Sequence, residues 1–293
     1  MLAPRRIVVG IDRSLSARIA LEHAARRAGP DGRLLLATVV APLLDAIGRS
    51  LSGLESDRRA AAQELVDRLA GDVAVDTETR VVDGNPAERL AELARDWPAD
   101  EIVVGSRGMG RFAAALGSVS HALLAHADHP VVVVPRAAAD HPRDARAHGL
   151  CTVVVGYDGS PPAEAALAYA AGRTSEGGRI VAVNAFHPPP DWLGWPNDQQ
   201  ALDAQQSHGR ELLRALEERG AGAELVTSLL EGPPARAIVA AADARDADEI
   251  IIGSRGFGRL RGVLGSVSHA VLHEADRPVV VIPADAVPAV GGG

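Results

Sequence analysis

Lysine is absent from this chain of 293 residues, so all 30 of its basic residues are arginines. Without lysine the protein cannot form a Schiff base, hold pyridoxal phosphate, or place a P-loop lysine on a phosphate. The single cysteine, Cys151, excludes an intramolecular disulfide and a multi-cysteine metal site, and such scarcity is typical of a reducing compartment. We therefore expect a cytoplasmic protein outside several large enzyme classes.

Long apolar runs and excess positive charge are missing as well. No stretch approaches the roughly 18 uninterrupted apolar residues that a membrane span needs. The opening segment MLAPRRIVVG has charge too close to its short apolar run for a signal peptide. A net charge of −8 argues against a general binder of nucleic acid or anionic membranes. Apolar residues still make up 47% of the chain, which is the balance of a folded protein of about two domains.

The chain repeats itself at about half its length. The segment IVVGSRGMGR from Ile102 returns as IIIGSRGFGR from Ile250, and LGSVSHA from Leu116 returns from Leu264. A period this long indicates a duplicated domain, because solenoid repeats run roughly 20–50 residues. The predicted organisation is a first domain at 1–136, a linker at 137–149, a second domain at 150–284 and a disordered tail at 285–293.

Strand and helix patterns alternate in each copy, and apolar runs interleaved with helices indicate parallel strands buried on both faces. The fold class that we predict is α/β, with two tandem doubly wound, five-stranded parallel-sheet domains of the Rossmann-like, adenine-nucleotide-binding type. The predicted strands are 7–10, 34–40, 77–82, 101–104 and 131–134, and in the second copy 180–185, 225–230, 249–252 and 279–282 after an opening strand at Val153. The predicted helices include 58–69 and 206–219, and others begin at Pro86, Pro233, Ser118 and Ser266.

The repeated glycine segments indicate a site for an anion. Ligands of doubly wound sheets bind beyond the carboxyl ends of the strands, near the point where strand order reverses. There, Gly105-Ser-Arg-Gly108 leaves the fourth strand and Gly117-Ser118 opens the next helix. Glycines admit a ligand close to the backbone, a helix start offers N–H groups, and Arg107 and Arg111 add charge, so a phosphate fits best. The alternative is that the glycines only make tight turns between strand and helix.

Both halves resemble the universal stress protein family, specifically its ATP-binding branch. That branch carries Gly-x2-Gly-x9-Gly-Ser/Thr after strand four and an aspartate in a Val-Gly-x-Asp context after strand one, which Asp12 and Asp158 match. The chain departs from this pattern at two points. In both copies eight residues separate the second and third motif glycines where the family has nine, and Arg13 stands where the second copy has Gly159. We interpret the shorter loop as a tolerated deletion.

The resemblance implies one adenine nucleotide site in each domain, with ATP as the bound ligand. Asp12 and Asp158 would contact the adenosine end, since a carboxylate beside phosphates would repel them; the alternative for each is a solvated loop carboxylate that caps the next helix. The implied adenine edge is the backbone at Val39, Val40, Val183 and Asn184. The other implied contacts are Gly10, Gly105, Arg107, Gly108, Gly110, Arg111, Gly117, Ser118, Val119 and Ser120 in the first copy, and Gly156, Gly253, Arg255, Gly256, Gly258, Arg259, Gly265, Ser266, Val267 and Ser268 in the second.

We expect no metal held by the protein's own side chains and no catalytic residue, and we leave Mg²⁺ open as a companion of the phosphates. Histidines gather around the helix after the fourth strand: His121, His126, His129, His269 and His273. Only the last two are one turn apart, and no cysteine or carboxylate accompanies them in a metal-ligand pattern. We interpret them as helix-end histidines that the helix dipole favours.

Two functions stay open at this point. The resemblance implies a stress-response signalling module in which bound ATP biases conformation or partner choice without significant turnover. The alternative is a slow ATPase or nucleotide hydrolase on the same fold. For that reading the sequence offers neither a general base beside the phosphates nor a catalytic lysine.

The fifth strand of each copy bears on how the domains assemble. In the family's strand order this strand lies at the sheet edge, and residues 131–134 and 279–282 are wholly apolar, without a charge or proline to discourage pairing. We expect the two strands to lie antiparallel beside each other, which makes the domains an intramolecular pseudo-dimer, and we leave a homodimer of chains open. The expected partners are thus adenine nucleotides and this chain itself, with no nucleic acid and no membrane.

Overall fold

The computed structural model describes residues 5–42, 52–106, 117–140, 150–187, 198–254 and 264–283. The chain divides into two compact units, Ala3–Ala145 and Arg146–Gly293. Within each unit, helices pack against parallel strands. In these described ranges, no helix is both long and apolar enough to cross a membrane.

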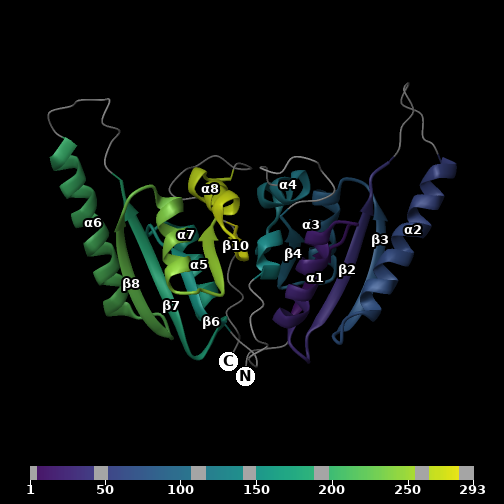
Figure 1. Ribbon diagram of the computed structural model, residues 1–293, viewed down its shortest axis with the longest axis horizontal. Coiled ribbons are helices and arrows are strands. Elements are labelled where there is room, and N and C mark those ends of the chain that lie inside the picture. The colour runs from purple at the N-terminus through teal and green to yellow at the C-terminus, as the bar shows by residue number, and fades with distance from the viewer. Residues whose placement is uncertain are drawn as a thin grey trace. The chain divides into compact units, whose positions relative to one another are not determined.

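Unit 1 is a doubly wound α/β domain whose strand order is β3-β2-β1-β4-β5, with all neighbours parallel. The order reverses between β1 and β4, and right-handed crossovers place α1 and α2 on one face and α3 and α4 on the other. Figure 1 shows α2 running beside β3. The elements are β1 (Arg6–Gly10), α1 (Leu15–Ala28), β2 (Arg33–Val40), α2 (Ser52–Gly71), β3 (Asp76–Asp83), α3 (Pro86–Asp96), β4 (Glu101–Gly105), α4 (Ser118–His126), β5 (Val131–Val134) and a short 3-10 helix (Arg136–Asp140).

Unit 2 repeats this topology with the strand order β8-β7-β6-β9-β10, so the predicted fold class is confirmed. Its elements are β6 (Leu150–Gly156), α5 (Pro161–Ala171), β7 (Thr174–Phe186), α6 (Asp198–Arg219), β8 (Glu224–Glu231), α7 (Pro234–Ala244), β9 (Glu249–Gly253), α8 (Ser266–Glu274) and β10 (Val279–Ile282).

Several elements begin at other residues than predicted. The helices α2 and α6 start six and eight residues before the predicted 58 and 206. Their first turns are polar or exposed, so they carry no apolar periodicity to mark them. The strand β7 starts at Thr174, and its early residues run along β6 through a register shift between Leu150 and Thr152. Pro233 is the N-cap of α7, which begins one residue later than predicted.

The amino end of β4 carries a buried ion pair. The side chain of Glu101 is 0% exposed, and its two oxygens accept hydrogen bonds from Nε and Nη2 of Arg27 at 2.6 and 3.1 Å. Arg27 lies in the last turn of α1, and Nη1 of Arg5 lies 3.5 Å from the same carboxylate. Because both charges have lost their water, the bidentate pairing is what makes their burial tolerable, and it ties α1 to β4.

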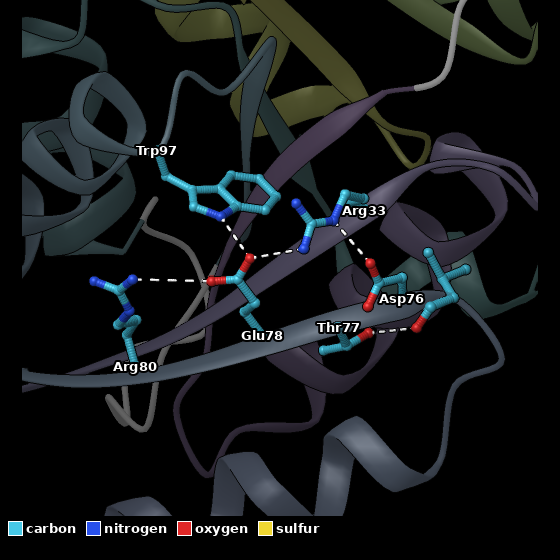
Figure 2. Close-up of polar contacts among 7 residues, drawn as sticks. Arg33, Asp76, Thr77, Glu78, Arg80 and Trp97 are labelled. Carbon is cyan, nitrogen blue, oxygen red and sulfur yellow. Dashed lines mark hydrogen bonds and ion pairs between the residues drawn. The ribbon is translucent and has the colours of Figure 1, made fainter.

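A second polar cluster lies at the amino ends of β2 and β3 (Figure 2). Arg33 donates to Asp76 at 2.8 Å and to Glu78 at 2.9 Å, and Nε1 of Trp97 donates to Glu78 at 3.1 Å. The guanidinium of Arg6 lies 4.5 Å from the centre of the Trp97 ring. In a parallel sheet these ends lie at the edge opposite to the one that binds ligands. The cluster is therefore interpreted as structural.

Replacing Glu101 with Gln should destabilise unit 1 by about 3 kcal/mol, because the Arg27 guanidinium would stay buried without its counter-charge. The matched control is Asp76→Asn, which breaks an ion pair whose side chains are 43% and 66% exposed. That change should cost less than about 1 kcal/mol. Calorimetric unfolding of the full chain measures both variants, and equal losses would show that burial gives the Glu101 pair no special importance.

Candidate functional site

The carboxyl ends of β1 and β4 lie side by side in unit 1. Val9 pairs with Val103, so the turns that leave these two strands start next to each other. The same holds in unit 2, where Val155 of β6 pairs with Ile251 of β9. This is the point where strand order reverses, which is where doubly wound folds bind their ligands.

Asp12 and Asp158 follow β1 and β6 in equivalent turns. In each, Oδ1 accepts a hydrogen bond from the N–H two residues on, that of Ser14 or Ser160, at 2.9 Å. These serines are the N-caps of α1 and α5, and their hydroxyl oxygens accept from the N–H three residues on at 3.1 and 3.4 Å. The serine thus caps the helix, while the aspartate holds the turn that presents its carboxylate at the carboxyl edge of the sheet.

Gly117 and Gly265 close the loops that leave β4 and β9. The N–H of Gly117 donates to the carbonyl of Ser106 at 2.7 Å, and that of Gly265 donates to Ser254 at 2.8 Å. The helices α4 and α8 therefore start where the strands end. Both glycines are N-caps with no side chain to offer. The opening N–H groups of each helix consequently have no partner in the helix or its cap, and they carry the positive end of the helix dipole.

The serines in these first turns have different roles. Ser120 and Ser268 are buried, and their hydroxyls donate to the carbonyls of Gly117 and Gly253 at 2.9 and 2.8 Å. Their side chains brace the loop, so only their backbone N–H groups suit the implied ligand. Ser118, like its counterpart in unit 2, is exposed at the helix start.

The glycines that end the strands are required by packing. A Cβ on Gly105 would lie 2.7 Å from the backbone carbon of Ser16 in α1, and one on Gly253 would lie 2.6 Å from Cβ of Pro162 in α5. Such distances are shorter than real contacts allow, so only glycine lets these helices sit this close to the sheet. For two of the motif glycines, packing between strand and helix is enough to explain the residue, as the alternative reading of the sequence proposed. They are Gly105 and Gly253. A Cβ on Gly10 or Gly156 would meet only side chains, with Leu90 of α3 at 3.0 Å or Ile238 of α7 at 2.8 Å as the nearest.

The two residue pairs implied for the adenine edge are not equivalent. The sheet register places Val183 beside the glycine that ends β6, just as Ala37 lies beside the glycine that ends β1. By this register Val183 and Asn184 correspond to Ala37 and Thr38, and the residue equivalent to Val39 is Ala185. Which pair edges the adenine stays a prediction. The sequence alone did not reveal this offset between the two pairs, because the pairing of neighbouring strands sets the register.

Two side chains that hold the aspartate turns were not assigned this role from the sequence. Oγ1 of Thr38 donates to the carbonyl of Ile11 at 3.0 Å, and Nδ2 of Asn184 donates to the carbonyl of Tyr157 at 2.8 Å. Each bond ties β2 or β7 to the residue just before the aspartate. A polar residue inside an otherwise apolar strand was the available signal.

The units differ in the contacts next to the aspartate turn. In unit 2 the hydroxyl of Tyr157 donates to Glu164 of α5, and Arg219 of α6 donates to the same carboxylate at 2.8 Å. Burial, reinforced by the hydrogen bond to Glu164 and by its charge, raises the pKa of Tyr157 to about 12. In unit 1 the corresponding ion pair has its charges exchanged. Arg18 of α1 is the positive partner, and it lies 3.7 Å from Asp72, which follows α2.

Part of the implied site stays a prediction. The loop residues that would complete the anion cradle lie outside the described residues: Arg107, Gly108, Gly110, Arg111, Arg255, Gly256, Gly258 and Arg259.

Fold and site together define a class: a tandem pair of doubly wound α/β domains, each with an open helix start at the reversal point of its sheet. The family model described as the universal stress protein family matches residues 4–135 and 151–283. A universal stress protein of Mycolicibacterium smegmatis is 31% identical, over 94% of this chain and 96% of its own. One of Thermus aquaticus is 38% identical over 45% of this chain and 97% of its own. The crystal structure of a universal stress protein from Archaeoglobus fulgidus covers 96% of both chains with a TM-score of 0.64 and 21% identity. This chain belongs to the universal stress protein family, in its tandem-domain form.

Tyr157 should ionise near pH 12 rather than at the ordinary tyrosine value of about 10. A raised pKa means that folding favours the neutral phenol, so this stabilisation is complete below pH 10 and is lost as the pH rises through about 12. Phenolate absorbance of the full chain, with Tyr157→Phe to assign one of the two tyrosines, measures the value. Glu164→Gln should lower it, and ionisation at the ordinary pH in the native chain would contradict the assignment.

Proposed function

We propose that each unit binds one adenine nucleotide, with ATP preferred, and that the chain is a nucleotide-dependent stress-response module without significant turnover. The observation that carries this proposal is the uncapped helix start beside the aspartate turn, which occurs in both units. The helix start suits phosphates, and the aspartate turn suits the sugar and the base.

The phosphates are proposed to lie at the first turns of α4 and α8. Backbone N–H groups and the dipole of a helix start stabilise anions without any lysine. In α4 the groups belong to Ser118, Val119 and Ser120, and in α8 to Ser266, Val267 and Ser268. Glycine as the N-cap keeps a side chain away from the approaching phosphate, which is the reason we assign ligand contact to Gly117 and Gly265 rather than to the strand-end glycines.

The adenosine end is proposed to lie at the aspartate turns. A carboxylate so close to phosphates would repel them, whereas it accepts hydrogen bonds from ribose hydroxyls. Asp12 and Asp158 therefore orient the nucleotide, with its base toward the ends of β2 and β7 at Val39 and Ala185. In the described ranges no three metal-ligating side chains lie together. We accordingly assign Mg²⁺ to the phosphates themselves, as is usual for this ion.

Calorimetry on protein stripped of ligand should show two ATP sites per chain and weaker binding of AMP, because the helix start addresses phosphates. Gly117→Ala and Gly265→Ala should each weaken ATP binding at one site by at least about tenfold, since a methyl group would block the approach of the phosphate. Both positions have φ near −60°, which alanine adopts without strain. Gly71→Ala, at a position where a Cβ meets nothing within 4 Å, is the matched control. No ATP heat at millimolar concentration would show that the site assignment is wrong.

ATP turnover should be far below the roughly 1–1000 per second of typical enzymes. Each aspartate already accepts the N–H of its own turn at 2.9 Å, and we place it at the end of the nucleotide away from the phosphates. Phosphate release from saturating ATP is the measurement, with the double variant Asp12→Asn, Asp158→Asn as the control. Rapid release that the double variant abolishes would favour the ATPase alternative.

A further inference from the structure

We propose that His269 and His273 of α8 form a two-histidine site for one borderline divalent transition-metal ion of the Ni²⁺, Cu²⁺ or Zn²⁺ class. Both side chains are exposed, and they lie one helical turn apart on the same face. Pairs of histidines at this spacing on a helix are a recognised way of binding such ions. From the sequence we expected no metal here, and the ring geometry is what changes that expectation.

The two imidazole rings are already close to the arrangement that a shared metal requires. Their centroids are 4.5 Å apart and their planes are inclined by 59°. With metal–nitrogen bonds of 2.0–2.1 Å, two imidazoles at neighbouring positions of one ion have centroids about 4.5–5 Å apart. Each imidazole has two nitrogens, so a hydrogen bond at one still leaves the other for the metal.

The surroundings of the pair favour a cation. His273 lies in the last turn of α8, where the helix dipole is negative, and Glu274 follows it directly. Arg236 of α7 lies 3.9 Å from that carboxylate, which partly neutralises its charge. No third His, Cys, Asp or Glu joins the two histidines within the described part of the chain, so water would fill the other coordination positions. An open site of this kind suits ions that accept nitrogen ligands together with water.

Unit 1 contains an internal comparison. Its equivalent helix, α4, carries His121 and His126, which are five residues apart and therefore point to different sides of the helix. Nδ1 of His126 instead lies 2.7 Å from the carbonyl oxygen of Ala122. The proposed metal site thus belongs to unit 2 alone, although the two helices are otherwise nearly the same in sequence.

The test is a titration of the untagged full chain with NiCl₂ and with ZnCl₂, in the absence of nucleotide and Mg²⁺, against a chromogenic chelator. The native chain should show one site that His269→Ala and His273→Ala each weaken by at least about tenfold, because a single imidazole loses the chelate advantage. His126→Ala should leave binding unchanged. Ala125→His should raise the stoichiometry from one ion to two, because it completes a one-turn pair with His121.

This titration tests the metal site independently of the proposed nucleotide binding, because no nucleotide is present. Unchanged affinity in both His269→Ala and His273→Ala would overturn the proposal, as would an absence of binding to the native chain. A failure of Ala125→His to add a site would overturn the explanation by spacing. Because all these side chains lie on exposed or half-exposed helix positions, the variants should fold, and circular dichroism of each confirms it.

Discussion

The pairing of β1 with β4, repeated as β6 with β9, is the constraint on which both sites depend. The chain builds outward from β1 to β3 and then crosses to the other side of β1. The turns that follow Gly10 and Gly105, far apart in the sequence, therefore leave the sheet together, as do those after Gly156 and Gly253. One turn supplies an aspartate and the other supplies an open helix start. Their juxtaposition places a carboxylate beside the positive end of a helix dipole at this edge of the sheet. The proposed orientation of the nucleotide depends on that contrast of charge.

The glycines of the repeated motifs serve two separate purposes. Those that end strands are needed because helices α1 and α5 pack directly on them, and a Cβ at Gly105 or Gly253 would overlap the helix backbone or Pro162. Those that cap α4 and α8 close their loops on Ser106 and Ser254 and keep the first helical turn bare. A duplicated motif therefore cannot by itself be taken as a list of ligand contacts. Part of it is preserved by packing, whether or not a nucleotide binds.

Within one shared frame the two units have diverged at positions next to the site. The network of Tyr157, Glu164 and Arg219 in unit 2 stands where unit 1 has a single exposed ion pair of reversed polarity. The ring centroids of the two α8 histidines lie 4.5 Å apart, whereas in α4 Nδ1 of His126 lies 2.7 Å from the carbonyl oxygen of Ala122. Strand order and helix starts are the same in both units. The differences therefore lie in side chains next to the candidate sites and not in the backbone that forms them. The two halves are best regarded as related sites with separate properties.

The sequence by itself determined the fold class, the duplication and the family, because these rest on patterns that are local and repeated: apolar runs, helical spacing and a motif present twice. It also located the aspartate turns and the starts of α4 and α8, whose turn and cap residues are local signals. It did not show that packing requires glycine at positions 105 and 253, that the side chains of Ser120 and Ser268 are buried, or that Thr38 and Asn184 hold the aspartate turns. It also chose adenine-edge pairs in the two copies that are offset from each other by two residues in the sheet register. Only the tertiary structure decided these points, because each depends on a neighbour brought close by the sheet from far along the chain.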